Sequence, residues 1–325
     1  MLMGRFWQGV WKTRSTYYLF DHQTLITIMK VNALISALAL TWTLIVQTSC
    51  QKDNAMETAA TSETKQIRSL PTQIDPNLIP ETQPANQTAV TVNIGTNVGG
   101  LYKALPNRYD STSKTYPLII FIHGVGELGN GTTQLSKVLA NGIPKLLNAR
   151  TFPSRFNVSG ENHSFLVVSP QFKQWPVAAD VNAVIDWAVA NMRVDQSRIY
   201  VSGLSMGGGI AWEYAIAYPN RIAAVVPMCG AAWPTQAQCS NMATARLPIW
   251  AFHNNDDGTV GAGITNMIID FTNSFGPTPV AQKTIWPSGG HDCWTKGFIF
   301  VTNCCTIFNN CCVAPFNSRT CSNKN

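Results

Sequence analysis

Apolar positions are distributed unevenly along the chain and divide it into four regions. Residues 1–50 contain one short apolar stretch, and residues 51–87 are rich in Thr, Ser, Gln, Asn, Pro and Ala with no apolar period. From residue 88 to about residue 297, short apolar runs alternate with helix-like stretches, and residues 298–325 place polar residues between cysteines. We therefore expect a leader, a flexible linker, one folded domain and a tail, in that order.

Within residues 88–297 the pattern predicts strands that alternate with helices. Leu118–Ile122 is a continuous apolar run, which is typical of a strand buried on both faces. The other expected strands are Ala89–Ile94, Leu101–Leu105, Phe165–Val168, Arg198–Val201, Ala223–Pro227, Pro248–Phe252 and Gln282–Trp286, and the expected helices are Val181–Met192, Gly208–Ala217 and Gly261–Ser274. We expect a leading antiparallel pair and then a mostly parallel sheet with helices on both faces, an α/β fold.

The leader has the layout of a signal peptide. Met29 and Lys30 are followed by an apolar stretch over residues 33–46 and then by Thr48–Cys50. A basic start, an apolar core of this length and a small-residue exit indicate a signal peptide more than a membrane span. The pattern is best explained if translation starts at Met29; the alternative is a signal anchor with an extended cytoplasmic tail. We expect an exported protein.

Cys50 is a candidate for lipidation. Thr48-Ser49-Cys50 resembles a bacterial lipobox, although Gln47 stands where an aliphatic residue is usual. An acylated cysteine would tether the protein to a membrane without spanning it. The expected location is therefore secreted, periplasmic or lipid-anchored at a bacterial cell envelope.

Composition fits a globular protein and argues against a nucleic-acid partner. The 325 residues are 45% hydrophobic and 12% charged, and a folded region of this length can bury a sizeable core. The formal net charge is +6, but the first fifty residues hold four of the 23 basic and one of the 17 acidic residues, which leaves +3 for the rest. No run of Lys or Arg marks a phosphate-binding stripe.

Ser205 lies in a motif that is typical of a catalytic nucleophile. An apolar strand runs into Gly203-Leu204-Ser205-Met206-Gly207, which matches G-x-S-x-G, and a helix is expected directly afterwards. A strained turn between strand and helix lifts a serine hydroxyl above the sheet, and its glycines let neighbouring backbone pass closely. The N-terminus of the following helix favours negative charge at the same point.

A serine hydroxyl needs a base to take its proton, and the base needs an orienting acid. In proteins with this turn, the acid and then the histidine follow the serine. His291 is the only histidine after residue 253, and it lies in a glycine-rich loop after an expected strand. Asp257 is the preferred acid over its neighbour Asp256, because Gly258-Thr259-Val260 follow it as in the usual acid turn.

Two backbone N–H groups are expected to bind the oxyanion that forms during acyl transfer. One is that of Met206, directly after the serine, and the other belongs to the loop after the first buried strand. Val125 is the first choice in that loop, and Gly124 is the next. His123 precedes the serine, and we expect it to brace the loop through hydrogen bonds, as His253 does before the acid loop.

Together these residues resemble the predicted peptidase/esterase branch of the α/β hydrolases, near feruloyl and acetylxylan esterases, polyhydroxybutyrate depolymerase-like enzymes and dienelactone hydrolase relatives. The resemblance covers about residues 88–297 and implies hydrolysis through an acyl-enzyme, without a metal or an organic cofactor. The matching segments are Tyr116–Leu118 with His123–Glu127, Ser169–Gln171 with Trp175-Pro176, Val194-Asp195 with Arg198–Tyr200, Pro227–Gly230, Pro248–His253 with Asp257, and Gly290–Trp294.

The tail departs from this resemblance. From Ile299 onward no helical period is visible, and five of the nine cysteines follow: Cys304, Cys305, Cys311, Cys312 and Cys321. Either the tail is authentic and rich in cysteine, or the reading frame slips near Gly297, which we favour; the domain would then lack a supporting helix. Within the domain, Cys239 with Cys293 or with Cys229 are candidates for a disulfide.

The expected substrate is an ester. Trp175, Trp233 and Trp294 fall on expected loops near the catalytic residues and are candidates for the substrate pocket, and no long lid insertion is visible. An open site on an exported enzyme favours an aryl ester or an ester linked to a polysaccharide or another polymer. The alternatives are a serine peptidase of the prolyl-oligopeptidase type and an inactive surface binding protein on a hydrolase scaffold.

Overall fold

The computed structural model describes residues 75–158 and 160–303, which belong to a unit that spans Pro71–Asn325. The expected leader, the candidate lipidation site Cys50, most of the expected linker and the five tail cysteines lie outside the described residues. Within the two described ranges, no helix combines the length and the apolar character needed to cross a membrane.

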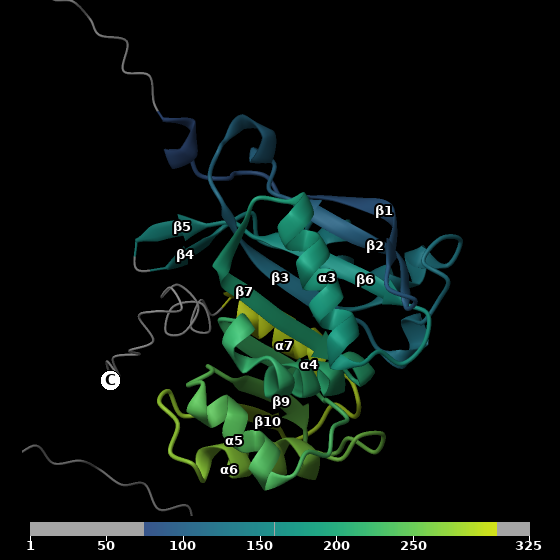
Figure 1. Ribbon diagram of the computed structural model, residues 1–325, viewed down its shortest axis with the longest axis vertical. Helices are drawn as coiled ribbons and strands as arrows, with labels where there is room; N and C mark the ends of the chain where they lie inside the picture. The colour runs from purple at the N-terminus through teal and green to yellow at the C-terminus, as the bar shows by residue number, and fades with distance from the viewer. Residues whose placement is uncertain (1–74, 159, 304–325) are drawn as a thin grey trace, which may run out of the picture. The chain divides into compact units, whose positions relative to one another are not determined.

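An eight-stranded sheet forms the centre of the fold (Figure 1). Its strand order is β1-β2-β6-β3-β7-β8-β9-β10, with β1 and β2 antiparallel at one edge and the strands from β6 to β10 parallel to one another. The strands are β1 (Asn86–Ile94), β2 (Val98–Leu105), β3 (Tyr116–Ile122), β6 (Leu166–Phe172), β7 (Val194–Leu204), β8 (Ala224–Met228), β9 (Trp250–Asn254) and β10 (Gln282–Trp286). A small hairpin, β4 (Phe156–Val158) with β5 (Glu161–His163), forms a separate sheet.

Helices cover both faces of the sheet, because alternate residues of each buried strand point to opposite sides. Leu118 and Ile120 of β3 belong to one apolar cluster, and Ile119 and Phe121 belong to another. The first cluster includes residues of α3 (Ala178–Asn191), α4 (Met206–Ala217), α5 (Gln236–Thr244) and α6 (Gly263–Asn273), and the second includes residues of α2 (Gly142–Asn148) and α7 (Trp294–Asn303).

The structure confirms the expected α/β architecture and corrects it in detail. The leading antiparallel pair, the parallel strands and the three expected helices are present within a few residues of their expected bounds. Three helices, α2, α5 and α7, are absent from the expectation. The expectation that no helix follows Ile299 is wrong for residues 299–303, which continue α7. In that helix Phe298 is buried and its ring lies 5.6 Å from that of Phe121, so α7 supports the sheet.

The parallel strands set the position of the candidate site. Since β3, β6, β7, β8, β9 and β10 run in one direction, the loops after their carboxyl ends lie along one edge of the sheet. Those loops carry the residues selected from the sequence: Val125, Trp175, Ser205, Trp233, Asp257 and His291.

Candidate active site

Ser205 occupies a strained turn between β7 and α4. Its φ of 55° and ψ of −117° lie outside the usual regions for a residue with a side chain. Gly203 and Gly207 make this turn feasible, because a Cβ on Gly203 would lie 2.4 Å from the carbonyl oxygen of Gly207, and a Cβ on Gly207 would lie 2.1 Å from that of Ile122. The Ser205 N–H donates to the Met228 carbonyl at 3.0 Å, which fixes the turn against β8.

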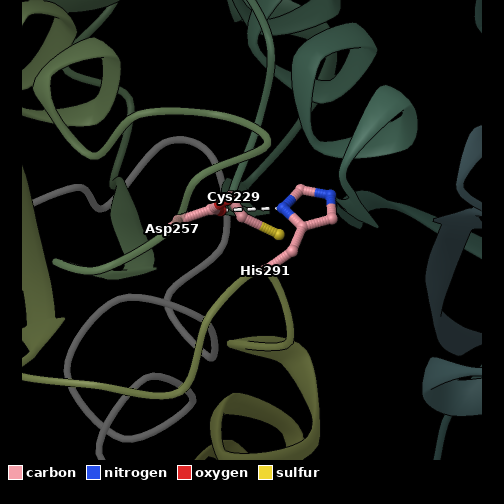
Figure 2. Close-up of side chains that lie close together, drawn as sticks. All are labelled: Cys229, Asp257 and His291. Atoms are coloured by element: carbon pink, nitrogen blue, oxygen red, sulfur yellow. Dashed lines mark hydrogen bonds and ion pairs between the residues drawn. The ribbon is translucent and has the colours of Figure 1, made fainter.

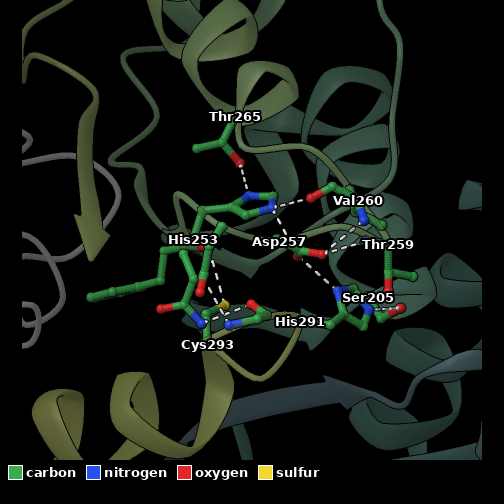
Figure 3. Close-up of polar contacts among 12 residues, drawn as sticks. Ser205, His253, Asp257, Thr259, Val260, Thr265, His291 and Cys293 are labelled. Atoms are coloured by element: carbon green, nitrogen blue, oxygen red, sulfur yellow. Dashed lines mark hydrogen bonds and ion pairs between the residues drawn. The ribbon is translucent and has the colours of Figure 1, made fainter. Parts of the chain in front are cut away.

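His291 bridges Ser205 and Asp257 (Figure 3). It lies in the loop between β10 and α7, and its Nε2 is 2.8 Å from the Ser205 Oγ. Its Nδ1 is 2.7 Å from the Asp257 Oδ2. The carboxylate can only accept, so Nδ1 carries the proton and Nε2 is free to receive one from the serine hydroxyl. This chain of hydrogen bonds can raise the nucleophilicity of Ser205.

Asp257 is an anion at the end of this series of hydrogen bonds. Its side chain is fully buried, and its Oδ1 accepts the backbone N–H groups of Thr259 at 2.8 Å and Val260 at 2.9 Å. Burial alone would raise the pKa of the carboxyl group, but the hydrogen bonds from His291 and from the two backbone groups outweigh it and lower the pKa. The carboxylate therefore stays charged and fixes the imidazole.

His253 provides a second imidazole for the same carboxylate. It is completely buried in β9, and its Nε2 lies 2.7 Å from the Val260 carbonyl oxygen and 3.2 Å from the Asp257 Oδ2. Its Nδ1 lies 2.8 Å from the Thr265 Oγ1 in α6. Burial lowers the pKa of His253, so it stays neutral, with the proton on Nε2 facing two acceptors. The bracing role expected for His253 thus extends to the acid.

Asp256, the alternative acid, has a different position. Its carboxylate accepts the N–H groups of Gly289 at 3.2 Å and Gly290 at 2.8 Å. The hydrogen bond from Gly290 is the main reason that the pKa of Asp256 is lowered. The two neighbouring aspartates therefore contact the same histidine loop, Asp256 at its backbone and Asp257 at the imidazole.

The loop that was expected to complete an oxyanion site lies beside Ser205. A Cβ on Gly124 would be 3.7 Å from that of Ser205, so this loop passes close to the turn. Val125 begins a short helical turn, Val125–Glu127, and Met206 begins α4. The N–H of a first helical residue has no acceptor within its own helix, which leaves both groups available for a ligand.

His123 braces this loop as the sequence predicts. Its Nε2 accepts the Phe172 N–H at 3.0 Å, and its Nδ1 therefore carries the proton and donates to the Gly124 carbonyl oxygen at 2.7 Å. The residue is buried, and burial lowers its pKa to about 4. A neutral imidazole with both nitrogens engaged cannot serve Ser205 as a base.

The three candidate pocket tryptophans differ in their surroundings. The Trp294 ring meets that of His291 edge to face, with centroids 5.4 Å apart. Trp175 follows β6 with 50% of its surface exposed, and Trp233 follows β8 with 72% exposed. Trp294 therefore contacts His291, whereas Trp175 and Trp233 lie at the same edge of the sheet and expose apolar surface to solvent.

The expected disulfides of Cys239 are wrong. Cys229, Cys239 and Cys293 are buried free thiols. Cys239 lies in α5 within the first apolar cluster, whereas Cys229 and Cys293 lie in the second, across the sheet. The neighbour of Cys293 is instead Cys229, and this second thiol, together with burial, raises the pKa of Cys293. The Cys293 thiol donates to the Phe252 carbonyl oxygen at 3.4 Å.

Fold and site together define a protein of the α/β-hydrolase class. A model of the phospholipase/carboxylesterase family matches residues 109–308, which is more than half of the chain. The chain belongs to this family.

Similar proteins share parts of the chain at low identity. A poly(3-hydroxyalkanoate) depolymerase C of Paucimonas lemoignei is 26% identical over an alignment of 232 residues. The match covers 59% of this chain and 53% of that protein, so the chain spans about half the length of this relative. The feruloyl esterase module of Clostridium thermocellum, solved with sinapinate, is 17% identical with a TM-score of 0.50 and covers 72% of this chain and 91% of that one. A thermostable esterase is 19% identical with a TM-score of 0.49 and covers 69% of this chain and 62% of that one.

Proposed function

We propose that this protein is a serine hydrolase that cleaves carboxylic esters through an acyl-enzyme on Ser205. The observation that carries the proposal is the hydrogen-bonded chain from the Ser205 Oγ through both nitrogens of His291 to the Asp257 carboxylate. The strained φ of Ser205 supports it, because backbone strain of this kind is concentrated at functional sites. Membership of the phospholipase/carboxylesterase family favours an ester over an amide.

The reaction follows from the hydrogen-bond directions. Nε2 of His291 takes the hydroxyl proton as the Ser205 Oγ attacks the ester carbonyl carbon, and Asp257 stabilises the imidazolium. The N–H groups of Met206 and Val125 stabilise the oxyanion. His291 then returns the proton to the leaving alcohol, and a water molecule, activated by the same nitrogen, hydrolyses the acyl-serine and frees the acid.

We further propose that the alcohol or acyl part of the substrate belongs to a polymer or carries an aryl group. Trp175, Trp233 and Val125 are exposed and follow three different strands at the same edge of the sheet as Ser205. We propose that they form an apolar rim for the substrate, which a small, soluble ester does not need. A relative named as a poly(3-hydroxyalkanoate) depolymerase and a structure named as a feruloyl esterase are consistent with both substrate types.

A substrate panel tests the reaction class. We expect turnover of p-nitrophenyl acyl esters and methyl ferulate, and no turnover of aminoacyl anilides, with all turnover lost in Ser205→Ala. Faster cleavage of the anilides than of the esters would establish a peptidase. Absence of turnover on every substrate would leave the binding protein as the better description.

The apolar rim has a matched control. Phe275 is also exposed, but it precedes β10 and therefore lies toward the opposite edge of the sheet. We expect Trp233→Ala to lower the rate on suspended polyester particles or feruloylated polysaccharide while leaving p-nitrophenyl acetate unaffected, and Phe275→Ala to leave both rates unchanged. Equal effects of the two substitutions would contradict a substrate-binding rim.

Export and a lipid tether are part of the same proposal and rest on the leader pattern. Metabolic labelling with a fatty acid in a bacterial host is expected to mark the full-length protein and not Cys50→Ala. Equal labelling of both would exclude Cys50 as the site of acylation.

A further inference from the structure

Three potential metal ligands from three different loops converge (Figure 2), and one of them, His291, is hydrogen-bonded to Ser205. Cys229 follows β8, Asp257 follows β9 and His291 follows β10. The Cys229 Sγ, a carboxylate oxygen of Asp257 and a ring nitrogen of His291 all lie within 4.8 Å of one another. Figure 2 shows the sulfur next to the hydrogen bond between the carboxylate and the imidazole. The thiol is not used in the proposed reaction.

These three donors match the chemistry of Zn²⁺. Thiolate, imidazole and carboxylate are its usual protein ligands, and three protein ligands with a fourth position for water make a complete tetrahedral set. Bond lengths of about 2.0–2.3 Å place ligand atoms about 3.3–3.6 Å apart around one ion. The observed separations of up to 4.8 Å therefore need small side-chain rotations, including a slight opening of the contact between Asp257 and His291.

The charges of these ligands and the backbone at Cys229 also favour a divalent cation. A thiolate and a carboxylate together neutralise a divalent cation, so the loaded site would bury no net charge. Cys229 has a φ of 41°, a conformation that favours glycine, and its N–H is fixed to the Phe252 carbonyl at 2.8 Å. Cys229 thus carries a side chain at a strained backbone position, and that side chain faces Asp257 and His291.

We propose that Cys229, Asp257 and His291 form an inhibitory site for Zn²⁺ and similar thiolate-binding divalent cations. Binding would release the thiol proton of Cys229 to solvent and move the proton of the His291 Nδ1, the nitrogen that faces Asp257, to Nε2. With a proton already on Nε2, the imidazole could no longer accept the proton of Ser205. The inhibition rests on the proposed ester hydrolysis, whereas binding of the ion does not.

Inhibition tests the assignment in the full chain. We expect Zn²⁺, but not Mg²⁺, to inhibit hydrolysis of p-nitrophenyl acetate and EDTA to restore it. Each variant is compared with its own uninhibited rate, and Cys229→Ala should raise the half-inhibitory Zn²⁺ concentration by about 10- to 100-fold. Cys239→Ala is the matched control, a buried thiol in the other apolar cluster, and should leave both the rate and the inhibition unchanged.

Metal binding to a variant that lacks Ser205 tests the metal site separately from the proposed ester hydrolysis. In Ser205→Ala, Co²⁺ should produce a thiolate charge-transfer absorption that decreases by one equivalent when Cys229→Ala is added. The six cysteines outside the described residues are common to both proteins and cancel in this difference. Three results would overturn the metal site, whatever the outcome for ester hydrolysis. They are an unchanged cobalt spectrum, equal zinc inhibition of wild type and Cys229→Ala, or a disulfide between Cys229 and Cys293 in the isolated protein.

Discussion

His123 makes the stability of this protein sensitive to mild acid. The imidazole is buried, its Nε2 accepts the Phe172 N–H and its Nδ1–H donates to the Gly124 carbonyl. Protonation would place a second N–H against that of Phe172, where no acceptor is available. The folded state therefore excludes the proton that the unfolded chain readily binds.

The pKa of His123 sets the size of the effect. It is about 4 in the folded protein and 6.5 for an ordinary histidine. Between these values the unfolded chain binds more protons, so the stability is complete above pH 6.5 and declines as the pH falls toward 4. From pH 7 to pH 5 this one group should remove about 2 kcal/mol from the free energy of unfolding, at about 1.4 kcal/mol for each pH unit in the steep range.

The substitution His123→Gln tests this value. A glutamine side chain can accept from Phe172 and donate to Gly124, but it does not titrate. We expect urea unfolding to give a decrease in the free energy of unfolding from pH 7 to pH 5 that is about 2 kcal/mol smaller in the variant than in the wild type. Contributions from Asp257 and His253 are common to both proteins and cancel. Equal decreases would refute the assignment of a neutral, buried His123.

Two further substitutions examine the site and its support. Asp257→Asn should fold normally and lower kcat by about 10⁴-fold, because an amide in place of the carboxylate favours the wrong tautomer of the histidine; a variant that keeps most of its activity would show that another group orients the base. Gly207→Ala places a Cβ 2.1 Å from the Ile122 carbonyl oxygen and should lower the free energy of unfolding by at least about 3 kcal/mol. A Cβ on Gly258 meets nothing within 4 Å, so Gly258→Ala is the control in the same urea measurement. Similar stabilities of the two alanine variants would contradict the close packing of the turn.

The parts of the structure that the sequence predicts are those encoded by contiguous residues. The buried strands are visible because β3 is apolar at almost every position, and the turn at Ser205 is visible because strand, motif and helix follow one another directly. Helix α5 was missed because its nine residues bury only Cys239, Met242 and Ala243. Helix α2 was missed because it contains Gly142 and Pro144, which usually mark a loop.

Contacts between loops depend on the order of the strands, which periodicity does not define. The sequence places Asp257 and His291 after strands, and their loops meet because β9 and β10 are neighbours. The same adjacency directs Asp256 to the backbone of the histidine loop, a contact that no sequence pattern predicts. The sequence pattern predicts Cys229 only as a disulfide candidate, although its position directly after an expected strand also places it at the same edge of the sheet as Ser205.

The central claim is that Ser205 is the nucleophile, and active-site labelling tests it most directly. A fluorophosphonate probe should modify the wild-type protein once, peptide mass spectrometry should locate the adduct on Ser205, and Ser205→Ala should lose both the label and the hydrolysis of p-nitrophenyl acetate. A label on another residue, or a Ser205→Ala variant that hydrolyses the ester at the wild-type rate, would contradict the account.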